Sequence, residues 1–540
     1  MKLSVLAAAL SFSLSGMAIA EDVHKLDLSL NVIGQHQTGV FDDSASEIVA
    51  HDPDSQRLFA VNASAASVDV LDINDPTNPL QIGMIDATEL GASANSVAVH
   101  KGVVAVAIEA EDKQSPGLVA FYNTIDLGLI GTIQVGALPD MLTFTPNGKY
   151  LLVANEGEPN DDYSVDPEGS VSIIDLRHGI AHAKVRTADF KRFNKRAEKL
   201  KKRGIRIFGP GATVAQDLEP EYIAVSKNSR KAWVSLQEAN ALAVINIPQA
   251  KVVALQPLGT KDHSLPANAL DVSNKDDVIN IANWPIKGMY QPDAIASYRF
   301  HGRTYIVTAN EGDSRDYDGF SEEARVKDLD LDPIAFPNAD ALQDSAALGR
   351  LKTTTVNGDI DGDGDFDEIY SYGARSFSIR NANGKLIYDS ADDFERITAE
   401  LLPDNFNSNN DDNDSFDSRS DDKGPEPEGV AIGKVEDHQF AFIGLERLGG
   451  IMVYDITNPH QVTFVDYLNN RDFSVDAELE SGVSNPLAGD LGPEGITFID
   501  EDDSPVEKPL LVVGNEVSGT TTLYAIEVNE EEDKDLEEDD

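Results

Sequence analysis

The sequence contains no cysteine and is short of basic residues, and each shortage excludes classes of function. Without cysteine among its 540 residues, the chain has no disulfide framework, no thiolate nucleophile and no cysteine-ligated metal site. Its 43 lysine and arginine residues face 94 aspartate and glutamate residues, which gives a net charge of −51. Because nucleic acids and anionic membrane surfaces attract basic faces, we expect neither as a partner. Such acidity instead favours a protein in a salty medium or one that collects cations.

Long apolar runs are also missing beyond the first twenty residues, so we expect no transmembrane segment. Residues 1–20 have the pattern of a signal peptide: Lys2, an apolar run over residues 3–17 and a terminal Ala18-Ile19-Ala20. This pattern predicts cleavage and a secreted or periplasmic protein. Residues 527–540 hold ten acidic residues and one lysine, and we expect an acidic disordered tail over residues 529–540.

A short acidic or asparagine-bearing signature precedes an apolar strand seven times. The acidic or asparagine residues of the seven signatures, five of them directly after a proline, are Glu47, Asn95, Asp140, Glu221, Asp293, Glu428 and Glu494. In each unit a second strand follows and ends in a polar residue, usually glutamate, and a third strand with period-two alternation comes after it. Four antiparallel strands in seven units predict an all-β fold, a seven-bladed β-propeller forming one domain over residues 21–528. Residues 26–33 should close the ring beside residues 523–526, and two stacked β-domains are the alternative.

Six long insertions accompany these repeats, and the repeat phase places all of them on one face of the propeller. They span residues 156–169, 181–218, 259–291, 312–374, 397–424 and 471–492. Function usually resides on a face built up by loops. Residues 191–206 predict one short basic helix, either a nucleic-acid patch or, as the net charge favours, a counter-charge over acidic neighbours. Residues 405–422 predict either a disordered loop or a loop ordered by a cation.

The same phase gathers carboxylates at the mouth of the central channel. First strands begin with Glu47, Asp140, Glu221, Asp293, Glu428 and Glu494, and second strands end with Glu109, Glu156, Glu238, Glu311, Glu446 and Glu516. Like charges in close proximity require protons, basic residues or metal for compensation. Since nearby basic residues are too few, we expect oxygen-ligated divalent cations, Ca²⁺ before Mg²⁺ or another divalent cation. Alternatively, individual carboxylates only bond loop amides or neighbouring blades.

A second acidic group is typical of a calcium loop. It alternates Asp359, Asp361, Asp363 and Asp365, with Gly364 at the sixth position. The twelfth position is Tyr370, where the pattern requires a bidentate glutamate, and no flanking helices are evident. We therefore expect a calcium loop of modified geometry, with an acidic hairpin as the alternative.

Four stretches of the chain resemble the choice-of-anchor I family. They are residues 154–159, 215–222, 373–379 and 417–429, with sequences such as Ala-Asn-Glu-Gly-Glu-Pro and Gly-Ala-Arg-Ser-Phe-Ser-Ile. That family includes mesenchyme-specific cell-surface glycoprotein-like proteins and bacterial proteins labelled alkaline phosphatase. The resemblance covers nearly all of the chain after residue 20 and implies an exported propeller.

Two functions fit these residues better than others. The first is a calcium-dependent phosphoesterase, similar to propeller phytases by analogy of architecture alone. In it Glu428 and Glu494 reach a central cation, while Arg375, Lys423 and Arg447 stabilise charge on the phosphoryl oxygens. The second is an adhesion or matrix protein ordered by calcium, whose loop face binds a surface ligand. A third function, a redox propeller that holds a quinone or haem, fits the residues less well than these two. We expect the protein to be a monomer.

Overall fold

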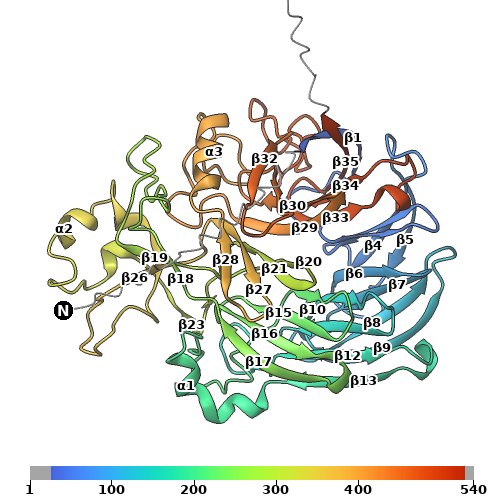
Figure 1. The fold of residues 1–540 in the computed structure, drawn as a ribbon, viewed down its shortest axis with the longest axis horizontal. Helices are drawn as coiled ribbons and strands as arrows, with labels where there is room; N and C mark the ends of the chain where they lie inside the picture. The colour runs from blue at the N-terminus through green and yellow to red at the C-terminus, as the bar shows by residue number, and fades with distance from the viewer. Residues whose placement is uncertain (1–25, 530–540) are drawn as a thin grey trace, which may run out of the picture.

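Seven four-stranded sheets with antiparallel neighbours build most of the molecule in the computed structural model, which describes residues 26–529 (Figure 1). The first three sheets in chain order are β2 (Val49–Asp52), β3 (Arg57–Asn62), β4 (Ser67–Asp72) and β5 (Leu80–Asp86); β6 (Ala94–His100), β7 (Val103–Ile108), β8 (Pro116–Asn123) and β9 (Leu129–Ala137); and β10 (Pro139–Phe144), β11 (Tyr150–Asn155), β12 (Ser170–Asp175) and β13 (Lys184–Asp189). The next three are β14 (Ile223–Val225), β15 (Lys231–Leu236), β16 (Ala241–Asn246) and β17 (Lys251–Pro257); β20 (Ile295–Phe300), β21 (Arg303–Asn310), β27 (Ser376–Asn381) and β28 (Leu386–Asp389); and β29 (Pro427–Val435), β30 (His438–Leu445), β31 (Ile451–Asp455) and β32 (Thr463–Leu468). The seventh sheet comprises β33 (Pro493–Ile499), β34 (Leu510–Asn515), β35 (Thr520–Asn529) and β1 (Asp27–Gln37).

The sheets form a closed ring. Their first strands contact one another in the order β2, β6, β10, β14, β20, β29, β33 and back to β2. The seventh sheet takes its outermost strand from the other end of the chain: β1 pairs with β35, with Leu30 opposite Ile526 and Gly34 opposite Leu523. The propeller prediction, including the closure of the ring by residues 26–33, is therefore confirmed.

The hydrophobic core lies between neighbouring sheets. Second and third strands are buried along almost their whole length, as in β11 and β34, because other sheets cover both of their faces. Outer strands such as β5 are largely exposed. One core cluster joins the first two sheets through Phe59, Val70 and Val106, and similar clusters lie between later neighbours.

The insertions add structure that the repeats do not contain. The three α-helices of the described chain are α1 (Ala197–Lys201), α2 (Ala339–Leu342) and α3 (Asp393–Leu401). Short 3₁₀ turns are η1 (Ile180–His182), η2 (Lys191–Arg196), η3 (Ile247–Gln249), η4 (Val326–Asp328), η5 (Leu348–Arg350) and η6 (Glu501–Asp503). The predicted basic helix is thus η2 followed by α1, and α2 and α3 were not predicted. The predicted insertion at residues 181–218 also contains a blade strand, β13.

Two insertions together form a satellite lobe, residues 260–289 and 316–371, which projects from the ring at the left of Figure 1. Its strands are β18 (Thr260–Asp262), β19 (Ile286–Met289) and β26 (Ile369–Ser371) in one sheet, with the pairs β22 (Asp316–Tyr317) and β23 (Phe320–Ser321), and β24 (Glu323–Arg325) and β25 (Lys352–Thr354). The lobe has a hydrophobic cluster of its own, which includes Leu270, Val326 and Leu348.

Both predicted terminal segments lie almost wholly outside the described residues. The signal peptide at residues 1–20 is one, and the acidic tail is the other, although β35 extends to Asn529. Across residues 26–529, no helix combines the length and the apolar character that crossing a bilayer demands.

Candidate metal centre

The acidic signature of several first strands lies on a β-bulge. In the ladder between β29 and β30, Pro427 pairs with Leu445 and Val430 pairs with Ile443, so Glu428 between them has no partner in the ladder. The ladder between β33 and β34 leaves out Glu494 in the same way. The first strand β10 has an equivalent irregularity at Asp140. A bulge leaves its extra residue out of the ladder and redirects its side chain. The sequence therefore folds so that these carboxylates leave the plane of the sheet at the inner edge of each blade.

In two blades, the asparagine that ends the second strand fixes the start of the loop that carries the next acid. Asn155 ends β11, donates from Nδ2 to Ser172 Oγ at 3.0 Å and accepts from the backbone N–H of Gly136 at 2.9 Å. Asn310 ends β21 and donates to Ser378 Oγ at 2.8 Å. These bonds tie the second strand to the third, so the following glutamates, such as Glu156, begin their loops from a fixed point.

These carboxylates meet in one cavity of about 510 Å³ at the channel mouth. Its acidic lining residues are Asp42, Asp140, Glu156, Glu221, Glu238, Asp293, Glu311, Asp313, Glu428, Glu446, Glu494 and Glu516. All but two of the predicted ring carboxylates, Glu47 and Glu109, belong to this lining. The basic side chains in the lining are those of Lys423 and Arg447.

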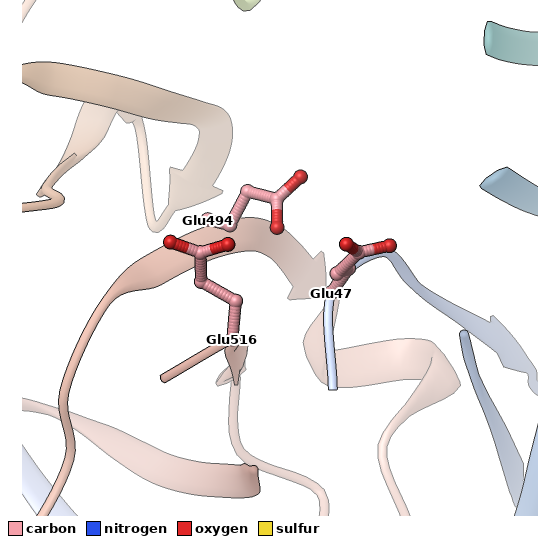
Figure 2. A group of neighbouring side chains, drawn as sticks. All are labelled: Glu47, Glu494 and Glu516. Carbon is pink, nitrogen blue, oxygen red and sulfur yellow. The ribbon is translucent and has the colours of Figure 1, made fainter. Parts of the chain in front are cut away.

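Several carboxylates are close enough to share a cation. In each of four groups, one oxygen per residue lies within 4.8 Å of the others, and the groups are Glu47, Glu494 and Glu516; Glu156, Glu221 and Glu238; Asp293, Glu311 and Glu428; and Glu311, Glu426 and Glu446. Figure 2 shows the first group, in which Glu47, Glu494 and Glu516 come from separate segments and their carboxylates lie side by side. Glu47 thus joins the centre although it does not line the cavity.

Burial and mutual repulsion make the ionised form of these groups costly. Burial raises the pKa of Glu47 to about 8 and the pKa of Asp140 to about 6, and neighbouring carboxylates add to both shifts. Burial, then repulsion from nearby carboxylates, holds the pKa of Glu221, Glu428 and Glu494 well above the usual range. Such groups need either a proton or a cation.

The pKa of Glu426 shifts in the opposite direction. Burial acts to raise its pKa, but the charges of Lys423 and Arg419 outweigh that effect and hold the pKa below the usual range. Lys423 Nζ lies 2.8 Å from Glu426 Oε2 and also contacts Glu311. Arg447 lies 3.1 Å from Glu426 and 3.0 Å from Glu446. Basic residues therefore compensate the carboxylates around Glu426 and leave the others of the centre without a basic partner in the lining.

Three buried carboxylate oxygens at the channel mouth have no hydrogen-bond partner in the described part of the chain. The Oε2 atoms of Glu221, Glu428 and Glu494 have no hydrogen-bond partner within residues 26–529. Buried polar atoms normally have a partner, and a set of carboxylate oxygens is the donor set that Ca²⁺ and Mg²⁺ prefer. The residues present therefore fit a divalent cation.

Two predicted site residues lie away from this centre. Glu109 accepts a hydrogen bond from Asn95 at 3.5 Å and does not line the cavity. Arg375 does not line it either: its guanidinium donates to Glu395 at 2.5 Å and to the carbonyls of Asp271, Ser420 and Asp422. Arg375 is a buried clamp between loops, and its placement gives no support to a role at the channel mouth.

The predicted calcium loop is a separate, exposed turn of the satellite lobe. The Asp359 carboxylate accepts from the backbone N–H groups of Gly362 and Gly364, and Asp361 and Asp363 accept from backbone N–H groups two residues ahead. Asp365 is grouped with Asp367 and with Asp332, which lies outside the loop. Tyr370, at the twelfth position, donates its hydroxyl to Glu368.

Sequence reasoning missed three residues of the centre, Asp42, Asp313 and Glu426. Asp42 and Asp313 lie in connections outside the repeat, where no phase assigns them to the channel. Glu426 lies two residues before Glu428 in the Pro425-Glu426-Pro427-Glu428 stretch, and that doubled Pro-Glu pattern was the one available signal.

Curated relatives are similar over part of the chain. Gigasin-3a of Magallana gigas is 32% identical over 191 residues, which cover 34% of this chain and 67% of that protein. The mesenchyme-specific cell surface glycoprotein of Strongylocentrotus purpuratus is 25% identical over 350 residues, 58% of this chain and 44% of that one. The chain thus spans less than half of the latter's length.

Among solved structures, the β-propeller domain of Myceliophteria thermophila Cps50 (Swd1) aligns over 92% of this chain and 99% of that chain, with a TM-score of 0.42 and 8% identity. A family model described as the choice-of-anchor I domain matches residues 47–459. Since that match spans most of the 540 residues, the chain belongs to the choice-of-anchor I family.

Proposed function

We propose that this protein is an extracellular or surface-exposed phosphoesterase that depends on divalent cations and acts at the carboxylate-lined channel mouth. The observation that carries the proposal is the set of carboxylate groups that share one cavity with Lys423 and Arg447. The similarity to a protein named as a cell surface glycoprotein supports the location.

Three groups would hold the cations; two of them lack a basic partner in the lining, and in the third only Glu311 has one, Lys423. Glu47, Glu494 and Glu516 form one, Glu156, Glu221 and Glu238 another, and Asp293, Glu311 and Glu428 the third. Ca²⁺ suits ligands from flexible loops and bulges better than Mg²⁺, which demands near-ideal octahedral geometry. When bound, such cations neutralise a phosphate ester and supply an activated water.

The chain's own residues contribute orientation and charge. Lys423 and Arg447 both line the cavity and both pair with Glu426, so two positive charges lie at the wall of the space that a phosphate group would enter. Positive charge fixed beforehand stabilises developing charge on phosphoryl oxygens without reorganisation. No nucleophilic side chain of the protein is required by this scheme.

The test is hydrolysis of a phosphomonoester by purified protein that has been treated with chelator and then supplied with Ca²⁺ or Mg²⁺. We expect hydrolysis to vanish with the chelator and to return with Ca²⁺. Hydrolysis that is unaffected by the chelator would overturn the metal-dependent scheme. No hydrolysis of any phosphoester at saturating Ca²⁺ would overturn the enzymatic one.

The second candidate is a calcium-ordered adhesion or matrix protein, which the similarity to the mesenchyme-specific cell surface glycoprotein favours. It shares the cation sites but requires no turnover. Calcium binding without hydrolysis, together with calcium-dependent retention on cell surfaces or matrix, would favour this alternative.

A further inference from the structure

A second set of buried oxygens lies outside the channel, where the loop before β29 meets the satellite lobe. Residues 406–407 pair with residues 417–419 through backbone bonds, from Asp417 N to Phe406 O at 2.8 Å and from Arg419 N to Asn407 O at 2.9 Å. This pairing brings the side chains of Asn407 and Asp417 to the same hydroxyl. Asn407 Nδ2 donates to Ser420 Oγ at 2.9 Å, and Ser420 Oγ donates to Asp417 Oδ1 at 2.5 Å.

Hydrogen bonds connect this loop to the satellite lobe through Glu395 of α3. Glu395 Oε2 accepts from Asn407 Nδ2 at 3.5 Å and from the backbone N–H of Asp271 at 3.3 Å. Asp271 in turn accepts from the backbone N–H of Asn280, whose side chain donates to Asp276 Oδ2 at 3.3 Å. Asp276, Asp271, Glu395, Asn407 and Asp417 therefore form one continuous polar cluster.

The cluster holds more negative charge than its basic neighbour compensates. Arg375 pairs with Glu395 and donates to the backbone carbonyl of Asp271, so its positive charge is already neutralised by Glu395. Burial, then repulsion from Asp271 and other carboxylates of the cluster, raises the pKa of Asp417 to about 8. Within residues 26–529, the carboxylates at 271, 276 and 417 thus form no ion pair of their own.

Three oxygens of the cluster are buried and unpartnered among residues 26–529. Asn407 Oδ1, Asp417 Oδ2 and Asp276 Oδ1 have no hydrogen-bond partner within the described chain. Asn407 is 0% exposed and Asp417 is 3% exposed, so bulk water does not reach them. In each of these residues the other side-chain polar atom is bonded within the cluster, and Asp276 is close enough to Asp417 for its charge to raise the pKa of Asp417.

We propose that Asp276, Asn407 and Asp417 bind a divalent cation of the calcium class, which joins the satellite lobe to the loop before β29. Carboxylate and amide oxygens without histidine or cysteine suit a hard cation such as Ca²⁺. Arg419 and Lys423 come soon after Asp417 in the chain and contact Glu426 at the channel mouth, so the same cation would fix the segment that supplies basic residues to the channel. The proposal requires no hydrolytic activity.

Hydrogen exchange on the full chain, with and without millimolar Ca²⁺ after chelation, tests the site. We expect Ca²⁺ to slow amide exchange about tenfold or more in residues 271–280 and 405–418, because binding suppresses local opening. Asp417→Asn keeps the bond with Ser420, and Asp276→Asn keeps the bond with Asn280. Both variants should lose this slowing, while Glu494→Gln at the channel mouth should retain it.

Three results would overturn the proposal: no slowing in the wild-type protein, slowing retained in both asparagine variants, or slowing lost in Glu494→Gln. Circular dichroism establishes that each variant is folded. If Asp417→Asn does not fold, Asp276→Asn decides, because Asp276 is only partly buried and its substitution leaves the loop packing intact.

Discussion

Gly429 lies directly against the backbone carbonyl of Glu494: a β-carbon at position 429 would come within 2.0 Å of that oxygen. The next blade repeats the relationship, since a β-carbon at Gly495 would lie 2.4 Å from the carbonyl oxygen of Glu47. The glycines that follow Glu428 and Glu494 therefore allow neighbouring blades to approach closely, and this approach sets the separation between the carboxylates of Glu428, Glu494 and Glu47.

Substitution of Gly429 should accordingly disturb the centre through the backbone. We expect Gly429→Ala to lower the free energy of unfolding by about 1–3 kcal/mol, as overpacking does, and to weaken calcium binding. Denaturant unfolding and calorimetric titration measure the two effects. Gly131→Ala in β9 is the matched control, because its β-carbon would meet Ile180 at an ordinary 3.8 Å. Equal stability in the two variants would contradict the nesting.

The second prediction concerns Arg375, which is buried and joins segments far apart in the sequence. Arg375→Ala leaves Glu395 buried without its partner, and loss of one member of a buried ion pair costs about 3–5 kcal/mol. We expect a lower midpoint of chemical unfolding, with calcium affinity of the channel unchanged in the folded protein. Arg177→Ala, which removes an exposed pair with Asp175, should have little effect. A variant as stable as the wild type would rule out the clamp.

Repeat phase explains why most of the centre was predictable. Alternation marks the strands, and a polar residue near the strand ends marks the channel, so residues such as Glu238 and Asp293 could be assigned to the channel mouth, whose cavity they line. The position of the Arg375 side chain could not be predicted in this way, because its direction depends on a left-handed backbone (φ 48°) and on contacts with residues 271 and 420–422. The satellite lobe had no periodicity to reveal its separate core. Both the direction of the Arg375 side chain and the core of the satellite lobe depend on long-range packing, which no local pattern encodes.

The third prediction is a pH dependence of stability from His263. Burial, then the charge of Lys261, lowers the pKa of His263 from 6.5 to about 3; Arg375 also lowers it, while Asp262 and the bond to the Asn268 carbonyl oppose the shift. The unfolded chain takes up a proton as the pH falls below 6.5 and the native state does not. Stability therefore falls with pH between 6.5 and about 3, by at most about 1.4 kcal/mol per pH unit from this group.

Denaturant unfolding at about pH 7 and about pH 5 measures this dependence. His263→Gln should show a smaller loss of stability between the two pH values than the wild-type protein. His460→Gln, at an exposed position, should behave like the wild type. An identical loss in His263→Gln and the wild type would contradict the prediction.

The fourth prediction concerns removal of metal. A cation that binds only the native state stabilises it by about 2.7 kcal/mol at a hundredfold excess over Kd. We expect the melting temperature of the chelated protein to rise with added Ca²⁺. Sodium chloride at matched ionic strength is the control, because it screens repulsion among exposed carboxylates without specific ligation. A melting temperature that responds equally to both salts would argue against a specific site.

The most direct test of the channel centre is the calcium dependence of phosphomonoester hydrolysis in Glu428→Gln and Glu494→Gln. Mutation of a residue that only supports a metal ligand lowers metal affinity or activity about 10–100-fold. We therefore expect the loss of a direct ligand to lower the rate or the calcium affinity at least about a hundredfold. The chelated variants should be at least as stable as the chelated wild type, since a buried glutamine needs neither the proton nor the cation that each of these carboxylates requires. Asp86→Asn, on an exposed outer strand, should keep full activity. Full calcium-dependent hydrolysis in both glutamine variants would contradict the account.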